Sequence, residues 1–564
     1  MEGKHTLRRL FGGVIGLAAF CLALARLLNA EADTPERLYC ATLALTLAAF
    51  LAMVLGRIGF GFLIAGALAG AIWLAGALKL VYLHEPLMAP DLLYFTGATT
   101  LDVIAHYPTL WHKCALAMLG GLALAALVWR LESPGFWRRQ SSRVAASLLA
   151  ALPLLAAMWP NGPLGDAHAI STWDFMSQAT RNPTSTFLRS FGRMRVSVPA
   201  FTPSAADSLD WGSAAIATQD SRPDLVAVLE ESTLDPRQWA ACTVPRCTLA
   251  MFEPDQATNA HGALKVHTYG GATWTSEFAF LTGMPHTLFG PAGIYAPYNL
   301  APGVRQSLPR QLHELGYRTI AIYPAPRHFV RAADAYADYG FDAFYDAEDI
   351  GLGPYWESTD LDLVHRFTDV LQRERAKDDR PLFFMLLTMH QHGPHDHPLD
   401  TLPSPWNEEP APALGERMNR NLGTYLFRAH QSDQAISALR TLLFDGNRPV
   451  ALLHFGDHHP SFDGIERTLK PALADETPAN AANLTYYRID SNFAAAPIRA
   501  YQALDIAFLG GALLDVARLP KNAYFEANTR LRERCAGRYE DCADKATLDS
   551  YLARTFGELH AFQR

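Results

Sequence analysis

The chain has 564 residues, of which 49% are hydrophobic, and carries a formal net charge of -8. This length exceeds what one ordinary hydrophobic core accommodates, so we expect at least two domains. The negative charge and the lack of an evident basic face argue against nucleic acid as a partner.

The hydrophobic excess lies in the first 160 residues, which contain five apolar stretches. Several of them approach the roughly 20 residues that a helix needs to cross a bilayer. The stretches run over Leu10–Leu28, Leu38–Leu55, Ile58–Leu83, Leu110–Trp129 and Val144–Trp159. The first stretch alone, with its basic flank, is also typical of a signal peptide, but the further stretches favour a retained helix. Residues 1–160 are therefore predicted to form a five-helix transmembrane domain.

Basic residues in the loops predict the orientation of these helices. Lys4, Arg8 and Arg9 precede the first stretch, and further arginines lie between the fourth and fifth, whereas the loops on the other face carry few. The positive-inside rule then places the N-terminus in the cytoplasm. Five crossings put everything after Trp159 outside the cytoplasm, and a count wrong by one would put it in the cytosol.

Residues 161–220 are predicted to be a connecting region, either periplasmic or at the membrane interface. Aromatic and arginine residues alternate between Trp173 and Arg195. This pattern is typical of an interfacial helix and equally of a helix packed on the soluble domain. The stretch Val198 to Ser208, which is rich in small residues and contains two prolines, is the predicted linker into the next domain.

The cysteines fall into two groups. Cys21, Cys40 and Cys114 lie in or beside apolar stretches, where a small buried hydrophobe is the ordinary role. The other four form two close pairs, Cys242 with Cys247 and Cys535 with Cys542. In an oxidising compartment these pairs would close two short disulfide loops, and in a reducing one they would be free thiols. The predicted topology favours the disulfides.

Residues 221–564 alternate short apolar runs with helical patterns. The predicted strands are Leu225–Leu229, Thr319–Tyr323, Leu382–Thr388 and Val450–Phe455. The predicted helices are Thr275–Thr282, Ser307–Leu315, Asp360–Arg375, Asn419–Leu443 and Lys545–Phe556. This alternation indicates one α/β domain with a mostly parallel sheet covered by helices.

Polar residues stand at three junctions of this domain. Glu231 follows one apolar strand, Asp457 and His458 follow another, and Thr273 follows two glycines and opens a helix. In open α/β sheets the chemistry lies at the carboxyl ends of the strands, and oxygen and imidazole ligands suit zinc or manganese. Taken singly, Glu231 could be a solvated strand end and Thr273 a helix cap. Together they indicate a metal site beside a hydroxyl group.

Two further groups of residues follow predicted strands. A loop after the third strand carries four histidines, which would contact substrate phosphate, form a second metal site or lie on the surface. The roles of five histidines stay open, namely His390, His395, His397, His454 and His459. Arg327 and Arg331 follow the strand Thr319–Tyr323, where a guanidinium suits phosphate binding or is an ordinary loop charge.

The order of these motifs resembles a known enzyme family. Glu-Ser at 231–232 is followed by Gly-x-Thr-x-x-Ser-Glu-Phe at 271–278, His-Gly-Pro at 392–394 and Gly-Asp-His at 456–458. With the segment 329–346, this resembles the lipoteichoic acid synthase and phosphoglycerol transferase branch of the alkaline phosphatase/sulfatase superfamily. The resemblance implies a multi-pass protein of the bacterial inner membrane with a sulfatase-like catalytic domain in the periplasm or outside.

The resemblance also implies roles for single residues. Glu231, Asp457 and His458 would bind a divalent metal ion, zinc or manganese, with a second ion left open. Thr273 would be both ligand and nucleophile. Substrate would be contacted by three further residues, His392, Arg331 and Trp274. Glu230 competes with Glu231 for the ligand role, and Glu231 is preferred because it directly precedes Ser232.

The expected activity is transfer of a phospho-alcohol headgroup, favoured as phosphoglycerol, from a membrane phospholipid to an extracytoplasmic glycan or lipid acceptor. The transfer would pass through a phospho-threonine intermediate. The alternatives are a phosphoethanolamine transferase acting on a cell-envelope glycan or lipid A, and a phosphodiester hydrolase of the same superfamily. Cys242-Thr243-Val244-Pro245-Arg246 misses the Cys-x-Pro-x-Arg pattern of classical sulfatases, because its proline is one place late. This argues against sulfatase activity.

Overall fold

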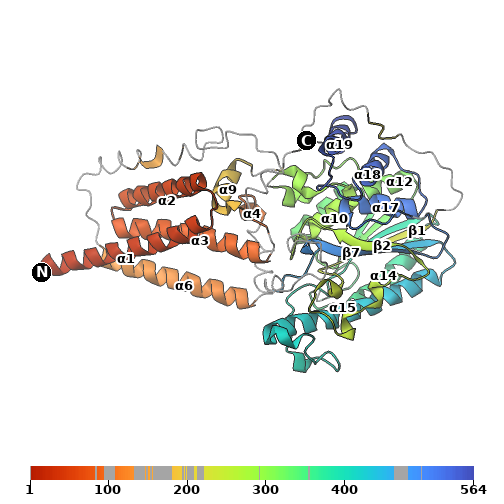
Figure 1. Cartoon of the computed structure of the whole chain (residues 1–564), viewed down its shortest axis with the longest axis horizontal. Coiled ribbons are helices and arrows are strands. Elements are labelled where there is room, and N and C mark those ends of the chain that lie inside the picture. The colour runs from red at the N-terminus through yellow and green to blue at the C-terminus, as the bar shows by residue number, and fades with distance from the viewer. Residues whose placement is uncertain are drawn as a thin grey trace. The chain divides into compact units, whose positions relative to one another are not determined.

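The computed structural model describes residues 2–82, 85–94, 108–132, 181–193, 209–212, 222–290, 292–353, 356–462, 481–496 and 498–563, with isolated positions between 147 and 199. The chain divides into two compact units (Figure 1). The first comprises residues 1–81, 85–197 and 290–292, and the second residues 82–84, 198–289 and 293–564.

Four long apolar helices dominate the first unit: α1 (Glu2–Asn29), α2 (Thr34–Leu55), α3 (Ile58–Tyr82) and α6 (Pro108–Leu131). Within the described part of the chain, these four helices are long and apolar enough to cross a membrane. They correspond to the first four predicted stretches. The fifth, Val144–Trp159, lies almost wholly outside the described residues, and its described positions 147, 150–152 and 155 are helical. A short helix, α4 (Asp91–Tyr94), follows α3.

The helices α1 and α3 approach each other through glycines. A Cβ atom on Gly16 would lie 2.0 Å from the carbonyl oxygen of Gly59, so no side chain fits there. Small residues permit such close packing between membrane helices. The Glu132 carboxylate accepts hydrogen bonds from the backbone N–H groups of Gly59 and Phe60, at 3.0 and 2.8 Å. A negative charge is favourable there because the N-terminus of a helix carries a partial positive charge.

The predicted connecting region contributes the helix α9 (Pro183–Arg189) to the first unit. The Glu31 carboxylate accepts hydrogen bonds from two backbone N–H groups of its first turn, at 2.7 and 3.3 Å. Arg189 forms an ion pair with Glu36 of α2 at 3.2 Å. These contacts hold α9 against the apolar helices, and residues 161–180 lie outside the described residues.

An eight-stranded sheet of order β4-β3-β5-β1-β6-β7-β2-β8 is the centre of the second unit. The neighbours from β4 to β6 are parallel, β7 is antiparallel to both β6 and β2, and β8 is parallel to β2. The strands are β1 (Asp224–Glu230), β2 (Thr258–Lys265), β3 (Arg318–Ile322), β4 (Ala343–Tyr345), β5 (Leu382–Leu387), β6 (Val450–Gly456), β7 (Leu484–Ser491) and β8 (Leu504–Asp505).

The four predicted strands are the parallel centre of this sheet, β3-β5-β1-β6. Strands β1, β5 and β6 are buried along their whole length, because helices cover both faces. The sequence did not reveal β2, β4, β7 and β8. The half-exposed β2 has the sequence TNAHGALK, which contains no continuous apolar run.

Helices lie on both faces of the sheet (Figure 1). Helices α10, α12, α17 and α18 lie on one face, and α14 and α15 on the other, where they share a core with Val226, Val228 and Tyr486. The helices of this unit are α10 (Thr273–Thr282), α11 (Ala296–Asn299), α12 (Leu308–Glu314), α13 (Ala332–Tyr339), α14 (Asp360–Arg375), α15 (Glu416–Phe444), α17 (Leu509–Val516), α18 (Ala523–Arg534) and α19 (Lys545–Leu552). The predicted fold class, apolar membrane helices plus a helix-covered and mostly parallel sheet, is confirmed.

Disulfide bonds join Cys242 to Cys247 and Cys535 to Cys542, the two pairs proposed from the sequence. The other three cysteines, in the apolar helices, are free thiols. Disulfides are typical of proteins folded in an oxidising compartment.

Candidate metal and nucleophile site

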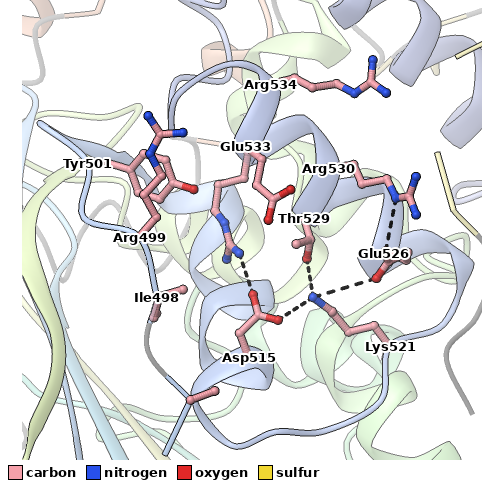
Figure 2. A pocket seen from close by; sticks show the side chains of 12 residues that line it. Ile498, Arg499, Tyr501, Asp515, Lys521, Glu526, Thr529, Arg530, Glu533 and Arg534 are labelled. Carbon is pink, nitrogen blue, oxygen red and sulfur yellow. Dashed lines mark hydrogen bonds and ion pairs between the residues drawn. The ribbon is translucent and has the colours of Figure 1, made fainter. Parts of the chain in front are cut away.

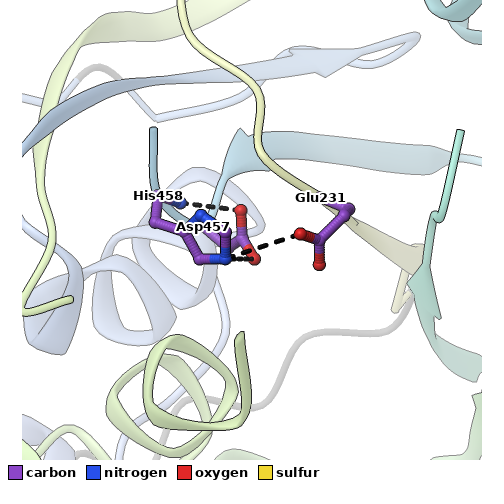
Figure 3. A group of neighbouring side chains, drawn as sticks. All are labelled: Glu231, Asp457 and His458. Carbon is purple, nitrogen blue, oxygen red and sulfur yellow. Dashed lines mark hydrogen bonds and ion pairs between the residues drawn. The ribbon is translucent and has the colours of Figure 1, made fainter. Parts of the chain in front are cut away.

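The site begins where the neighbouring parallel strands β1 and β6 end. Their register pairs Glu230 with Gly456, so Glu231 and Asp457 leave the sheet side by side. The N–H group of Asp457 donates to the Glu230 carbonyl at 3.2 Å. Glu231, Asp457 and His458 offer ligand atoms within 4.8 Å of one another, and all three residues are buried (Figure 3).

A tight turn brings Thr273 to these three residues. Gly270 and Ala272 take left-handed backbone angles, with φ of +66° and +62°, and Thr273 is the first residue of α10. Its hydroxyl donates a hydrogen bond to Glu231 Oε2 at 2.7 Å and lies 3.3 Å from His458 Nε2. The partial positive charge at the start of a helix favours an anion at this position.

The protonation of His458 follows from its neighbours. Nδ1 lies 2.8 Å from the carbonyl oxygen of His459, so Nδ1 carries the hydrogen and donates it. The other ring nitrogen, Nε2, lies 3.1 Å from Asp457 Oδ2 and 3.5 Å from Glu231 Oε1. In the neutral ring a lone pair thus faces carboxylate oxygens, an arrangement that a cation between them stabilises. Asp457 Oδ2 is buried and accepts no hydrogen bond from the described residues, so its lone pairs are available to bind a metal ion.

The electrostatics of the two carboxylates agree with a cation site. Burial and the charge of Glu231 hold the pKa of Asp457 well above its ordinary value. Burial also acts to raise the pKa of Glu231, but His458, His392 and the hydroxyls that bond it lower the pKa overall. Two buried carboxylates this close repel each other, and a divalent cation removes that repulsion. The oxygen and nitrogen donors present fit zinc or manganese.

His392 lies near these ligands in the loop after β5. The charge of Glu231 acts on its pKa, which burial lowers overall. Its ring packs on Trp356 with 4.6 Å between centroids, and its Nδ1 lies 2.8 Å from the Gly393 carbonyl oxygen. Arg428 Nη1 donates to the His392 carbonyl at 2.8 Å and so holds the loop in place.

The other two residues proposed to contact substrate have partners outside the ligand set. The indole N–H of Trp274 donates to the Ile294 carbonyl at 2.7 Å. Arg331 forms an exposed ion pair with Asp334 at 2.9 Å, at the start of α13. Among the described residues, neither side chain contacts Glu231, Asp457 or His458, so the substrate roles of Trp274 and Arg331 remain predictions.

Glu230 and Glu231 point to different surroundings, because successive strand residues face opposite sides. Glu230 accepts a hydrogen bond from the Tyr486 hydroxyl and lies 3.3 Å from His454 Nδ1. The structure therefore places Glu231, and not Glu230, beside Thr273.

The remaining histidines have other neighbours. His390 contacts Gln431, His397 contacts Arg428, His395 packs between Tyr425 and Phe462, and His459 bonds the Leu484 carbonyl. Among the described residues, Glu231, Asp457 and His458 are the one group of three side chains that could bind a metal ion together. The second metal ion considered from the sequence therefore stays a prediction.

Three residues form hydrogen bonds to the proposed metal ligands, and none of them was assigned a role from the sequence. The Ser232 N–H donates to Asp457 Oδ1 at 2.7 Å, and its hydroxyl donates to Glu231 Oε1 at 2.8 Å. The Ser276 hydroxyl donates to the Asp457 carbonyl at 2.7 Å, and the Thr388 hydroxyl accepts from the Glu231 N–H at 3.1 Å. Ser232 and Ser276 belong to the motifs Glu-Ser and Gly-x-Thr-x-x-Ser-Glu-Phe. Their place in these motifs was the sequence feature that could have identified them as supporting residues.

Comparison with known proteins finds a family model that matches the part of the chain around this site. The sulfatase family model matches residues 223–492, which contain the whole ligand set. A Haemophilus influenzae protein of uncharacterised function is 28% identical over 491 residues, covering 84% of this chain and 86% of that protein. A putative cyclic β-1,2-glucan modification protein of Rhizobium meliloti is 22% identical over 412 residues, covering 69% of this chain and 61% of its own length.

Two solved structures are also similar. The phosphoglycerol transferase GacH of Streptococcus pyogenes, in complex with sn-glycerol-1-phosphate, is 19% identical with a TM-score of 0.48, covering 60% of this chain and 87% of that one. The lipooligosaccharide phosphoethanolamine transferase EptA of Neisseria meningitidis is 15% identical with a TM-score of 0.48, covering 85% of this chain and 95% of that one. By its sequence match, the second unit of this chain contains a sulfatase-family domain over residues 223–492.

Proposed function

We propose that this chain is a membrane-anchored phosphotransferase that moves a phospho-alcohol headgroup, favoured as phosphoglycerol, from a phospholipid to a glycan or lipid acceptor outside the cytoplasm. The observation that carries the proposal is the Thr273 hydroxyl, 2.7 Å from Glu231 Oε2 at the start of a helix and beside His458. The apolar helices support a lipid donor, since they would hold the domain at a membrane. The disulfides support an extracytoplasmic location.

Glu231, Asp457 and His458 would hold the divalent ion, whose charge would lower the pKa of the Thr273 hydroxyl. Thr273 Oγ1 attacks the headgroup phosphorus, and a bond between them forms as the bond to the diacylglycerol oxygen breaks. The proton lost from the threonine hydroxyl leaves with diacylglycerol.

An acceptor hydroxyl then attacks the phosphorus of phospho-Thr273, and the bond between phosphorus and Thr273 Oγ1 breaks. The proton of the acceptor hydroxyl returns to Oγ1. The acceptor leaves carrying the phospho-alcohol. The half-buried His392 lies near Glu231, and its Nδ1 hydrogen is directed to the Gly393 carbonyl. Its Nε2 would donate a hydrogen bond to the phosphoryl oxygens once it takes up a proton, where charge increases in each transfer step.

The test is mass spectrometry of the full chain, purified in detergent and incubated with phosphatidylglycerol or phosphatidylethanolamine. We expect an adduct on the peptide that carries Thr273, with a mass that identifies glycerol phosphate or ethanolamine phosphate. Thr273→Ala should abolish the adduct and lower turnover by about a thousandfold or more. Thr275→Ala is the matched control, because Thr275 bonds the Ala272 carbonyl and not the ligands.

Retained turnover in Thr273→Ala would disprove the nucleophile. Lipid turnover by the wild-type protein without any added acceptor would favour a hydrolase. An adduct with the mass of ethanolamine phosphate alone would favour the phosphoethanolamine transferase.

A further inference from the structure

The second unit contains a pocket of about 540 Å3 that shares no residue with the site around Thr273 (Figure 2). Small-molecule sites usually enclose roughly 300–1,000 Å3, so this cavity can hold a ligand of sugar size. It is lined by helices α17 and α18, by Lys521 between them, and by Ala496, Ile498, Arg499 and Tyr501. Figure 2 shows Arg499 and Tyr501 across the pocket from Thr529 and Arg530.

The lining is rich in charge, with five cations and three carboxylates. Part of this charge is already paired. Asp515 accepts from Lys521 at 2.5 Å and from Arg532 Nη2 at 2.6 Å, and Arg530 bonds Glu526 at 3.2 Å. Arg530 also pairs with Asp210, outside the lining, at 2.6 Å. Among the described residues, Arg499 and Arg534 are the lining cations that form no ion pair with a carboxylate.

Arg532 has donors left over. The residue is 3% exposed, and Asp515 accepts a hydrogen bond from only one of its nitrogens, Nη2. The Tyr501 hydroxyl, which also lines the pocket, is a second hydrogen-bond neighbour. A guanidinium has five N–H donors, more than these two groups accept, and unsatisfied buried donors are costly, so the cavity favours a further acceptor.

Arg499 adds a cation at the mouth of the pocket. Its side chain is exposed and lies over the Tyr501 ring, with 5.8 Å to the ring centroid. Within the part of the chain that the structure describes, no carboxylate forms an ion pair with Arg499. A ligand oxygen could therefore bind the Arg499 guanidinium without displacing a carboxylate of the protein.

We propose that this pocket binds a phosphate group carried by a ligand of sugar or glycerol size. Phosphate offers several acceptor oxygens, and arginine forks match that geometry. Ala496 and Ile498 provide an apolar wall for the body of the ligand. Because the pocket and the Thr273 site share no residue, the ligand is a second one besides the lipid donor proposed above.

The test is isothermal titration of the full chain in detergent with glucose 6-phosphate, inorganic phosphate and glucose. We expect glucose 6-phosphate to bind, Arg499→Ala to weaken it about tenfold or more, and glucose not to bind. Glu533→Gln should tighten binding, because it removes an exposed carboxylate from the lining. Arg538→Ala is the matched control, since Arg538 is exposed nearby, bonds Gln502 and does not line the pocket.

Two further measurements distinguish binding in this pocket from binding at the Thr273 site. Asp457→Asn, which removes a proposed metal ligand, should leave the binding event in place, and Arg499→Ala should leave hydrolysis of a small soluble phosphodiester unchanged. Binding that Asp457→Asn abolishes, or that neither Arg499→Ala nor Glu533→Gln changes, would overturn the proposal. Equal binding of glucose and glucose 6-phosphate would also overturn it. A misfolded variant cannot bind more tightly, so Glu533→Gln keeps the test decisive.

Discussion

Two buried histidine–carboxylate clusters in the second unit show how the same residue types form opposite kinds of site. At His458 both carboxylates face Nε2, while Nδ1 donates to a backbone carbonyl. At His267 each nitrogen has its own carboxylate, with Asp505 Oδ1 2.9 Å from Nε2 and Glu540 Oε2 3.2 Å from Nδ1.

This difference in carboxylate contacts decides whether the positive charge of each cluster is on the histidine ring or must come from a bound cation. Burial acts to lower the pKa of His267, but Asp505 and Glu540 together raise it to about 10, so this ring carries the charge itself. Burial lowers the pKa of His458, whose ring is therefore neutral and leaves its carboxylates in need of a cation. The bond made by the second ring nitrogen distinguishes a built-in ion pair from a metal site.

The largest expected effect is at the metal cluster. Asp457→Asn should lower the bound metal per chain to near zero and reduce transfer by more than about a hundredfold, since even residues that only orient metal ligands cost 10–100-fold. It should not lower the melting temperature of metal-free protein, because burial and Glu231 already disfavour the Asp457 charge. Elemental analysis and a thermal melt measure both. Full metal content in Asp457→Asn would contradict the ligand assignment.

The corresponding change at the other cluster should affect stability and leave metal content unchanged. His267→Gln leaves the buried Asp505 and the half-buried Glu540 uncompensated, and breaking a buried pair costs about 3–5 kcal/mol. The wild-type stabilisation is complete below the unfolded pKa of about 6.5 and is lost as pH rises toward about 10. The difference between wild-type and variant melting temperatures should therefore shrink across that range. A constant difference would show that His267 is neutral.

The smallest expected effect is a loss of stability at the cluster of Glu230, His454 and Tyr486. The Tyr486 hydroxyl donates to Glu230 and lies 3.0 Å from His454 Nδ1, on the other side of β1 from the ligands. Tyr486→Phe should cost about 1.5–3 kcal/mol, as hydrogen bonds to charged groups do, with full metal content and activity. Loss of metal in this variant would show that Glu230 belongs to the metal site after all.

Much of the fold and site could be read from the sequence. A buried parallel strand needs a continuous apolar run, so β1, β3, β5 and β6 were visible in the chain. The helix α14 begins at the predicted Asp360, because Thr359 and Asp362 form a capping box that is encoded locally. Asp457, His458 and Thr273 were recognisable because each directly follows or opens such an element.

The sequence by itself thus determined the apolar helices, the parallel strands and the types of ligand at their ends, since these depend on local periodicity and length. Only the tertiary structure decided which nitrogen of His458 faces the carboxylates and that β2, β4, β7 and β8 extend the sheet. It brings Glu231, which the sequence had favoured over Glu230, into contact with Thr273. It also brought His267 between Asp505 and Glu540, and Arg499 opposite α18. These pairings join residues far apart in the chain, and they follow from strand order and burial, which no local pattern encodes.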